Sequence, residues 1–213
     1  MKNKLKQDLI GIASQRISSD DPSHDFLHEL RVLALSERIA FDEKADLDIV
    51  IPSALFHDLV TYSKDDYRSK NAPGESAELA KRILEEIREY PSDKIDRVQN
   101  AIQSCSYTRG IVPNLLEARI LQDADGLEAT GAISIMRTFS STGSMKRIFY
   151  NPTDPFCRDR NPDDLRYALD LFYTRLLKVK GRMNTALGKR IAARRTNFLK
   201  KFLDQLEMEL NEQ

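Results

Sequence analysis

Apolar residues recur at helical spacing through most of the chain. Leu5 and Leu9 belong to one such stripe near the N-terminus, and a second stripe lies between residues 28 and 40. This spacing predicts amphipathic helices that pack their apolar faces on a common core. Residues 47–62 are apolar over more of their circumference, which predicts a central helix. Strand-like alternation occurs only briefly, near residues 148–150, so we expect an all-α fold.

Turn-forming residues divide the remainder of the chain into further helices. Pro73-Gly74 marks the start of one helix, and Pro113 opens another. Ser, Thr, Gly and Pro accumulate between residues 139 and 162, which predicts a long loop. The helices that follow from this pattern cover residues 75–90, 93–104, 113–138, 163–180 and 185–211.

The charge balance argues against a polyanionic partner. The 33 basic and 33 acidic residues give a formal net charge of zero, whereas binding to nucleic acid or to a membrane surface calls for a basic excess. The stretch from 175 to 201 is strongly basic, but it carries apolar residues at helical spacing. We therefore expect it to be the solvated face of two packing helices, with contact to a polyanion as the alternative.

Cysteine usage and hydropathy narrow the class further. Cys105 and Cys157 are too few for a disulfide framework and too far apart for a Cys-x-x-Cys metal motif. No apolar run approaches the roughly 18 residues of a membrane span. The N-terminal segment is too polar for a signal peptide, so the sequence predicts a cytoplasmic protein with no membrane partner.

A spaced set of histidines and aspartates is the strongest chemical feature. His28 opens the second predicted helix, and His57-Asp58 lies 29 residues further on. Asp123 and Asp125 fall in a helix of otherwise apolar periodicity, where a buried carboxylate is costly unless it is paired or binds a metal. Two imidazoles and two carboxylates suit a divalent transition metal or Mg²⁺. Spacing alone leaves open a metal site or histidines that are simply satisfied in the core.

Four segments resemble the HD superfamily of metal-dependent phosphohydrolases, in particular a group of small bacterial and archaeal hydrolases. The segments are SHDFLHELRVLALSERIA, ALFHDLV, LEARILQDADGLEATGAISIMRTF and RMNTALGKRIAARRTNFLKKFLDQLEME. The resemblance extends from about residue 20 to residue 209. It implies a single-domain, all-α HD-domain helical bundle and hydrolysis of a phosphate ester or anhydride.

The resemblance also implies the ligands of one divalent ion, which would be Mn, Fe, Ni, Zn or Mg. Asp125 is expected as the last ligand because it stands in an Ala-Asp-x-Leu word of the superfamily, and Asp123 is the alternative. Asp58 is in addition the expected catalytic residue, since a carboxylate beside the ion can steer the proton of a water molecule. The four implied ligands are His28, His57, Asp58 and Asp125.

A phosphate substrate needs cationic or hydrogen-bonding partners. For His24, the alternative is a capping role in the Ser23-His24-Asp25 turn, and for the cations it is a solvated surface charge. The candidate substrate-binding residues are His24, Arg31, Lys64, Arg68 and Lys189.

The chain departs from its family pattern at three positions. Cys105 and Asp170 stand where relatives often have histidine, and Gly126 stands where they often have arginine. The missing histidines favour a site with one metal ion over a site with two. They leave open whether the substrate or the level of activity has changed.

Two functions follow from these observations. The first is a phosphohydrolase acting on a nucleotide or a similar small phosphorylated metabolite. The second is a non-catalytic HD-fold sensor that binds a nucleotide or a protein. The exact substrate and the oligomeric state stay open, and a homodimer is one alternative.

The resemblance also implies an internal organisation of the domain. An N-terminal helix would pack on the HD core, a loop would follow as a candidate lid, and C-terminal helices would complete the domain. These parts are expected at residues 1–19, 20–140, 141–162 and 163–213.

Overall fold

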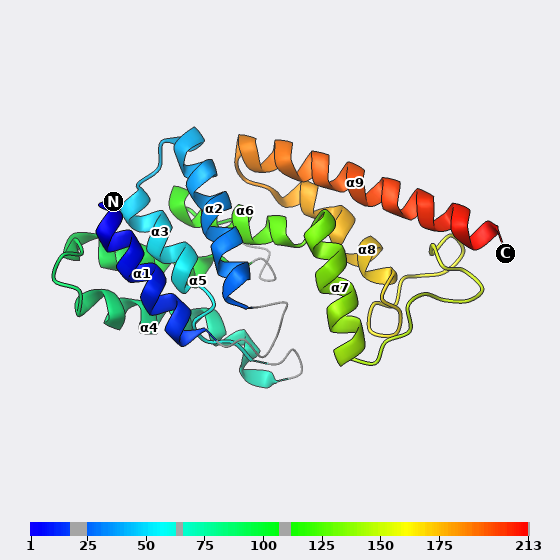
Figure 1. Ribbon diagram of the computed structural model, residues 1–213, viewed down its shortest axis with the longest axis horizontal. Coiled ribbons are helices and arrows are strands. Elements are labelled where there is room, and N and C mark those ends of the chain that lie inside the picture. Colours follow the sequence, from blue (N-terminus) through cyan, green and yellow to red (C-terminus); the bar gives the residue numbers. More distant parts are fainter. Residues whose placement is uncertain (18–24, 63–65, 107–111, 213) are drawn as a thin grey trace. The chain divides into compact units, whose positions relative to one another are not determined.

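The structure is a computed structural model that describes residues 1–17, 25–62, 66–106 and 112–212. In these residues the regular elements are helices, and the one strand-like feature is an isolated bridge between Ile148 and Tyr167. The all-α prediction is confirmed. The chain divides into two compact units, Met1–Asp125 and Gly126–Gln213 (Figure 1). No helix among the described residues is both long and apolar enough to cross a membrane.

The first unit is built around one short buried helix. This helix, α3, contacts α1, α2, α4 and α5, and all of its residues from Ile49 to Phe56 are buried. The prediction of a central helix is therefore correct (Figure 1). The elements of this unit are α1 (Asn3–Arg16), α2 (Phe26–Glu43), α3 (Leu47–Phe56), η1 (Tyr67–Lys70), α4 (Ala72–Glu85), η2 (Ser92–Lys94), α5 (Ile95–Ser104) and the part of α6 (Leu116–Glu128) up to Asp125.

Local side-chain contacts set the ends of the helices that carry the candidate ligands. Asp25 caps α2, because its Oδ1 accepts a hydrogen bond of 2.9 Å from the backbone N–H of His28. The central helix was predicted to run to residue 62, but it ends at Phe56 and His57 is its C-cap. Nδ1 of the His57 ring lies 2.9 Å from the Ala54 carbonyl oxygen. If the helix continued, this carbonyl would instead accept a hydrogen bond from a backbone N–H of the next turn.

The second unit has its own apolar core. Phe172 stacks on Phe202 with ring centroids 5.7 Å apart, and α9 packs on α7 and η4. The core residues are Leu169, Phe172, Leu176, Leu199 and Leu203. The basic side chains Lys189, Arg190, Arg194, Lys200 and Lys201 of α9 are exposed, as expected for a solvated face. The helices of this unit are α7 (Ala132–Ser144), α8 (Asp170–Thr174), η4 (Leu176–Arg182) and α9 (Ala186–Asn211).

The predicted helix at 113–138 is wrong as a single element, because α6 and α7 are separate. Gly131 between them has a φ of 88°, and a Cβ there would lie 3.0 Å from Cγ of Arg195. The Arg195 guanidinium donates a hydrogen bond to the Leu127 carbonyl at the end of α6. The predicted helix at 163–180 is also wrong, since short α8 and 3₁₀ helix η4 take its place.

Candidate metal centre

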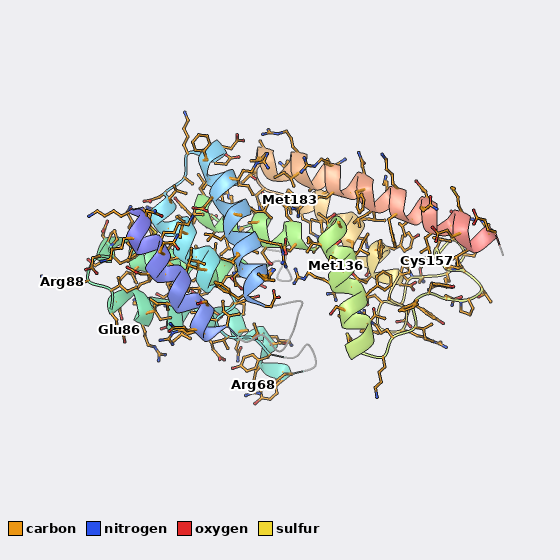
Figure 2. The ribbon with its side chains drawn as sticks, viewed as in Figure 1. Arg68, Glu86, Arg88, Met136, Cys157 and Met183 are labelled. Atoms are coloured by element: carbon orange, nitrogen blue, oxygen red, sulfur yellow. The ribbon has the colours of Figure 1, made fainter. Side chains whose placement is uncertain are left out.

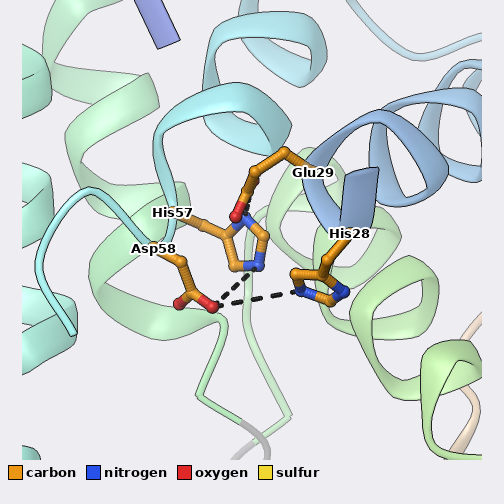
Figure 3. Close-up of side chains that lie close together, drawn as sticks. All are labelled: His28, Glu29, His57 and Asp58. Carbon is orange, nitrogen blue, oxygen red and sulfur yellow. Dashed lines mark ion pairs between the residues drawn. The ribbon is translucent and has the colours of Figure 1, made fainter. Parts of the chain in front are cut away.

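Side chains from three parts of the first unit converge on one point. His28 lies in the first turn of α2, His57 and Asp58 follow α3, and Asp125 lies on α6. The Nε2 atom of His28 is 3.9 Å from Asp58 Oδ2 and 3.6 Å from Asp125 Oδ1. The Nε2 atom of His57 is 3.8 Å and 4.0 Å from the same two oxygens. The four residues implied as ligands therefore lie together, three of them drawn in Figure 3.

The site is closed on its histidine side and open on its carboxylate side. His28 and His57 are 0% and 4% exposed, whereas the side chains of Asp58 and Asp125 are 29% and 33% exposed. A group approaching from solvent would therefore meet the carboxylates first.

While Nε2 of His57 faces the aspartates, Nδ1 of the same ring faces two oxygen acceptors. Its Nδ1 lies 2.9 Å from the Ala54 carbonyl oxygen and 3.0 Å from Glu29 Oε2. A nitrogen lone pair would be repelled by both oxygens, so Nδ1 carries hydrogen. In the neutral ring the free lone pair is then on Nε2, which has no hydrogen-bond partner among the described residues. This tautomer is the one that can bind a metal through Nε2.

Glu29 is a functional candidate that the sequence reasoning missed. It is fully buried on α2, next to His28 and against the ring of His57 (Figure 3). Its signal was present in the sequence, because Glu29 shares helical spacing with Val32 and Leu33, which are also buried. An acidic residue in an apolar stripe is costly unless it has a partner.

The electrostatics of the site follow from carboxylates that face buried rings. Burial lowers the pKa of His57, but Glu29, Asp58 and Asp125 raise it more, so this pKa lies well above its ordinary value. Burial raises the pKa of Glu29, although His57 opposes the shift. The surplus of negative groups around His57 calls for a positive charge at this point, whereas the pKa shift of Glu29 comes mainly from its burial.

Cys105 behaves differently from a metal ligand. The residue is buried at the end of α5, and burial raises the pKa of its thiol to about 12. Among the described residues, the ligand atoms that converge at this site come from histidine, glutamate and aspartate side chains. The donor set therefore consists of nitrogen and oxygen atoms.

The residues fit a divalent cation. Ligand atoms of His28, Glu29, His57 and Asp58 all lie within 4.8 Å of one another. Two ligand atoms each about 2.1 Å from an ion, at an angle between about 90° and 120°, are roughly 3.0 to 3.6 Å apart. The distances from each histidine Nε2 to the two aspartates are of this size or slightly larger. Glu29 lies at the opposite edge of the His57 ring, so Asp125 completes the set better.

Asp123 is the residue weighed against Asp125 as the last ligand. It is fully buried within α6, whereas Asp125 has a partly exposed side chain beside both histidines. The geometry therefore favours Asp125 as the fourth donor.

The predicted substrate-binding residues are scattered in the structure. Arg31 is partly buried on α2, one turn after His28. Arg68 lies at the surface on η1 (Figure 2), where its guanidinium pairs with Asp66 at 2.7 Å and lies 4.6 Å from the Tyr62 ring centroid. His24 and Lys64 lie outside the described residues. Lys189 is exposed on α9 and belongs to the second unit.

Known proteins match both the sequence and the fold. A family model of the HD domain matches residues 26–130. The uncharacterized protein YpgQ of Bacillus subtilis is 31% identical over 215 residues, which cover 99% of this chain and 96% of that protein. The chain belongs to the HD-domain family. The family assignment drawn from the four sequence segments is thus confirmed.

Solved structures of this HD-domain family extend over nearly the whole chain. An HD-superfamily hydrolase from Bacillus thuringiensis has a TM-score of 0.73 and 27% identity, with 100% of both chains covered. Bacillus subtilis YpgQ in complex with ADP has a TM-score of 0.72 and 27% identity, and the match covers 97% of this chain and 95% of that one. The HD-domain chain has the fold of HD-superfamily hydrolases.

Proposed function

We propose that the chain is a metal-dependent phosphohydrolase that cleaves a phosphate ester or anhydride of a nucleotide or a similar small phosphorylated metabolite. One observation carries the proposal: His28 and His57 direct Nε2 atoms toward Asp58 and Asp125, within 3.6 to 4.0 Å. The ADP complex of the relative YpgQ supports a nucleotide as the substrate class. No such arrangement is needed in a core that only packs.

The four side chains would hold one divalent ion, of Mn, Fe, Ni, Zn or Mg. Such an ion supplies Lewis-acid polarisation of a phosphate oxygen and lowers the pKa of a water molecule. His28 and His57 contribute neutral nitrogen donors, and Asp58 and Asp125 balance the charge of the ion.

The protein's own residues supply the remaining functions. Asp58 is 29% exposed while its Oδ2 faces both histidines, so we assign it the proton of the attacking water. Arg31 is our preferred phosphate partner among the described residues, because it lies one turn after His28. Arg68 would have to leave Asp66 to bind phosphate. His24, Lys64 and Lys189 stay predictions.

A metal-dependent release assay tests the proposal. Metal-stripped protein is supplied with Mn²⁺, Ni²⁺, Zn²⁺ or Mg²⁺ and incubated with nucleoside mono-, di- and triphosphates, and phosphate and pyrophosphate are measured. We expect release that requires the ion and disappears in Asp58→Ala. Tight metal binding without release from any of these compounds would contradict hydrolysis. It would favour the alternative of a nucleotide- or protein-binding sensor.

A further inference from the structure

We propose that Glu29 is a positioning residue that fixes the His57 ring and strengthens its Nε2 atom as a metal ligand. The proposal rests on the metal centre described above and adds a residue that acts behind it. Its carboxylate is fully buried, and Glu29 Oε2 lies 3.0 Å from His57 Nδ1.

The position of Glu29 against His57 Nδ1 favours a role behind the ring over the more obvious role of a fourth ligand. Figure 3 shows Glu29 on one side of the His57 ring, with Asp58 and His28 on the other side. The nitrogen that would hold an ion, His57 Nε2, is the one that faces Asp58. A carboxylate oxygen in contact with Nδ1 therefore acts on the ring and leaves the ion to the other donors.

Two acceptors lie close to His57 Nδ1, and they have different roles. The Ala54 carbonyl is 2.9 Å from Nδ1 with good hydrogen-bond geometry and sets the direction of the ring. Glu29 adds a second acceptor, because its Oε2 lies 3.0 Å from the same nitrogen, and neither of its oxygens receives a well-aligned hydrogen bond from the described residues. A carboxylate behind a metal-bound histidine raises the basicity of that ligand.

The buried charge also explains why Glu29 should depend on the metal. A buried carboxylate is unfavourable unless a positive group lies close by. An ion held by Nε2 of His57 would supply such a charge close to Glu29. Metal binding and the burial of Glu29 therefore stabilise each other.

Metal affinity measured by isothermal titration calorimetry tests this role. Metal-stripped wild type, Glu29→Gln and the control Glu37→Gln are titrated with Mn²⁺ and Zn²⁺. Glu37 lies on the same helix and pairs with Lys6 at the surface of the first unit. We expect Glu29→Gln to raise Kd about 10- to 100-fold, the usual effect of losing such a partner, and Glu37→Gln to leave Kd within about threefold of wild type.

The outcomes separate the two proposals. If wild type binds no ion, the metal centre is wrong and Glu29 has no ligand to position. If wild type binds and Glu29→Gln binds equally well, the metal centre stands and the role of Glu29 is wrong.

A second measurement uses the unaltered protein, in case Glu29→Gln fails to fold. In Zn²⁺-loaded wild type, nitrogen NMR of the His57 ring should find hydrogen on Nδ1 and the metal on Nε2. Hydrogen on Nε2, or a metal on Nδ1, would overturn the proposal.

Discussion

Two buried carboxylates, Glu29 in the first unit and Asp170 in the second, have opposite surroundings. Asp170 accepts a hydrogen bond of 2.7 Å from Arg160 and one of 2.6 Å from the backbone N–H of Asp163. Glu29 has the His57 ring beside it but no well-aligned hydrogen bond among the described residues. A buried carboxylate that is held by an arginine and a backbone N–H indicates a structural role, whereas one that lies against a histidine of the candidate metal centre is consistent with a role at that centre.

The contrast also explains one departure from the family pattern. Asp170 stands where relatives often have histidine, and here it holds Arg160, which in turn donates to the Asp154 carbonyl. Asp154 accepts hydrogen bonds from the backbone N–H groups of Arg158 and Asp159. The loop predicted at 141–162 begins later in the structure, because α7 continues to Ser144. The part that follows α7 is linked to α8 by a polar network, while its role as a lid stays a prediction.

The largest expected effect concerns the candidate ligands. Asp58→Ala should reduce metal-dependent phosphate release by about 10³-fold or more, because it removes a ligand and the proposed proton acceptor together. Asp96→Asn is the matched control, since the Asp96 side chain is 83% exposed, and it should retain full release. Equal phosphate release by Asp58→Ala and wild type would contradict the functional role assigned to the carboxylates of the first unit.

The next effect concerns the structural carboxylate. Asp170→Asn leaves Arg160 without its buried partner, so the free energy of unfolding should fall by about 3 kcal/mol. Urea unfolding measures this change, with the exposed Asp159→Asn as control. Metal affinity of folded Asp170→Asn should match wild type. A raised metal Kd together with unchanged stability would contradict the structural role assigned to Asp170 and its contrast with Glu29.

The same carboxylate predicts a pH dependence. Burial raises the pKa of Asp170, but Arg160 and the Asp163 N–H lower it more, so its pKa lies below the ordinary value. Its contribution to stability is therefore fully present above about pH 4 and is lost as the pH falls through the folded-state pKa. The stability difference between wild type and Asp170→Asn should shrink in this acidic range. A constant difference from pH 7 to pH 2 would argue against the ionised pair.

The smallest effect is expected at Cys105. Its buried thiol is not among the converging ligand atoms of the described residues, and a buried structural cysteine is inert, so Cys105→Ala should leave the metal Kd within about threefold of wild type. Stability should fall by about 1 kcal/mol because a small cavity forms, and Cys157→Ala serves as the control. A tenfold loss of metal affinity would make Cys105 a ligand and change the donor set.

The sequence predicted the parts of the molecule that depend on local pattern. Helical periodicity identified α1, α2, the central helix and α9, and the order of His28, His57-Asp58 and Asp125 identified residues that the fold brings together. The sequence did not predict features that depend on contacts between residues far apart in the chain. The end of α6 depends on Arg195, 68 positions away, and the role of Glu29 depends on where the His57 ring turns.

The most direct test of the metal centre is the anomalous diffraction of crystals of the protein loaded with Mn²⁺. The account predicts one anomalous peak about 2.0 to 2.3 Å from His28 Nε2, His57 Nε2, Asp58 and Asp125, with Glu29 behind His57 and not bound to the ion. A peak coordinated by Glu29 in place of Asp125, or no peak among these residues, would contradict it.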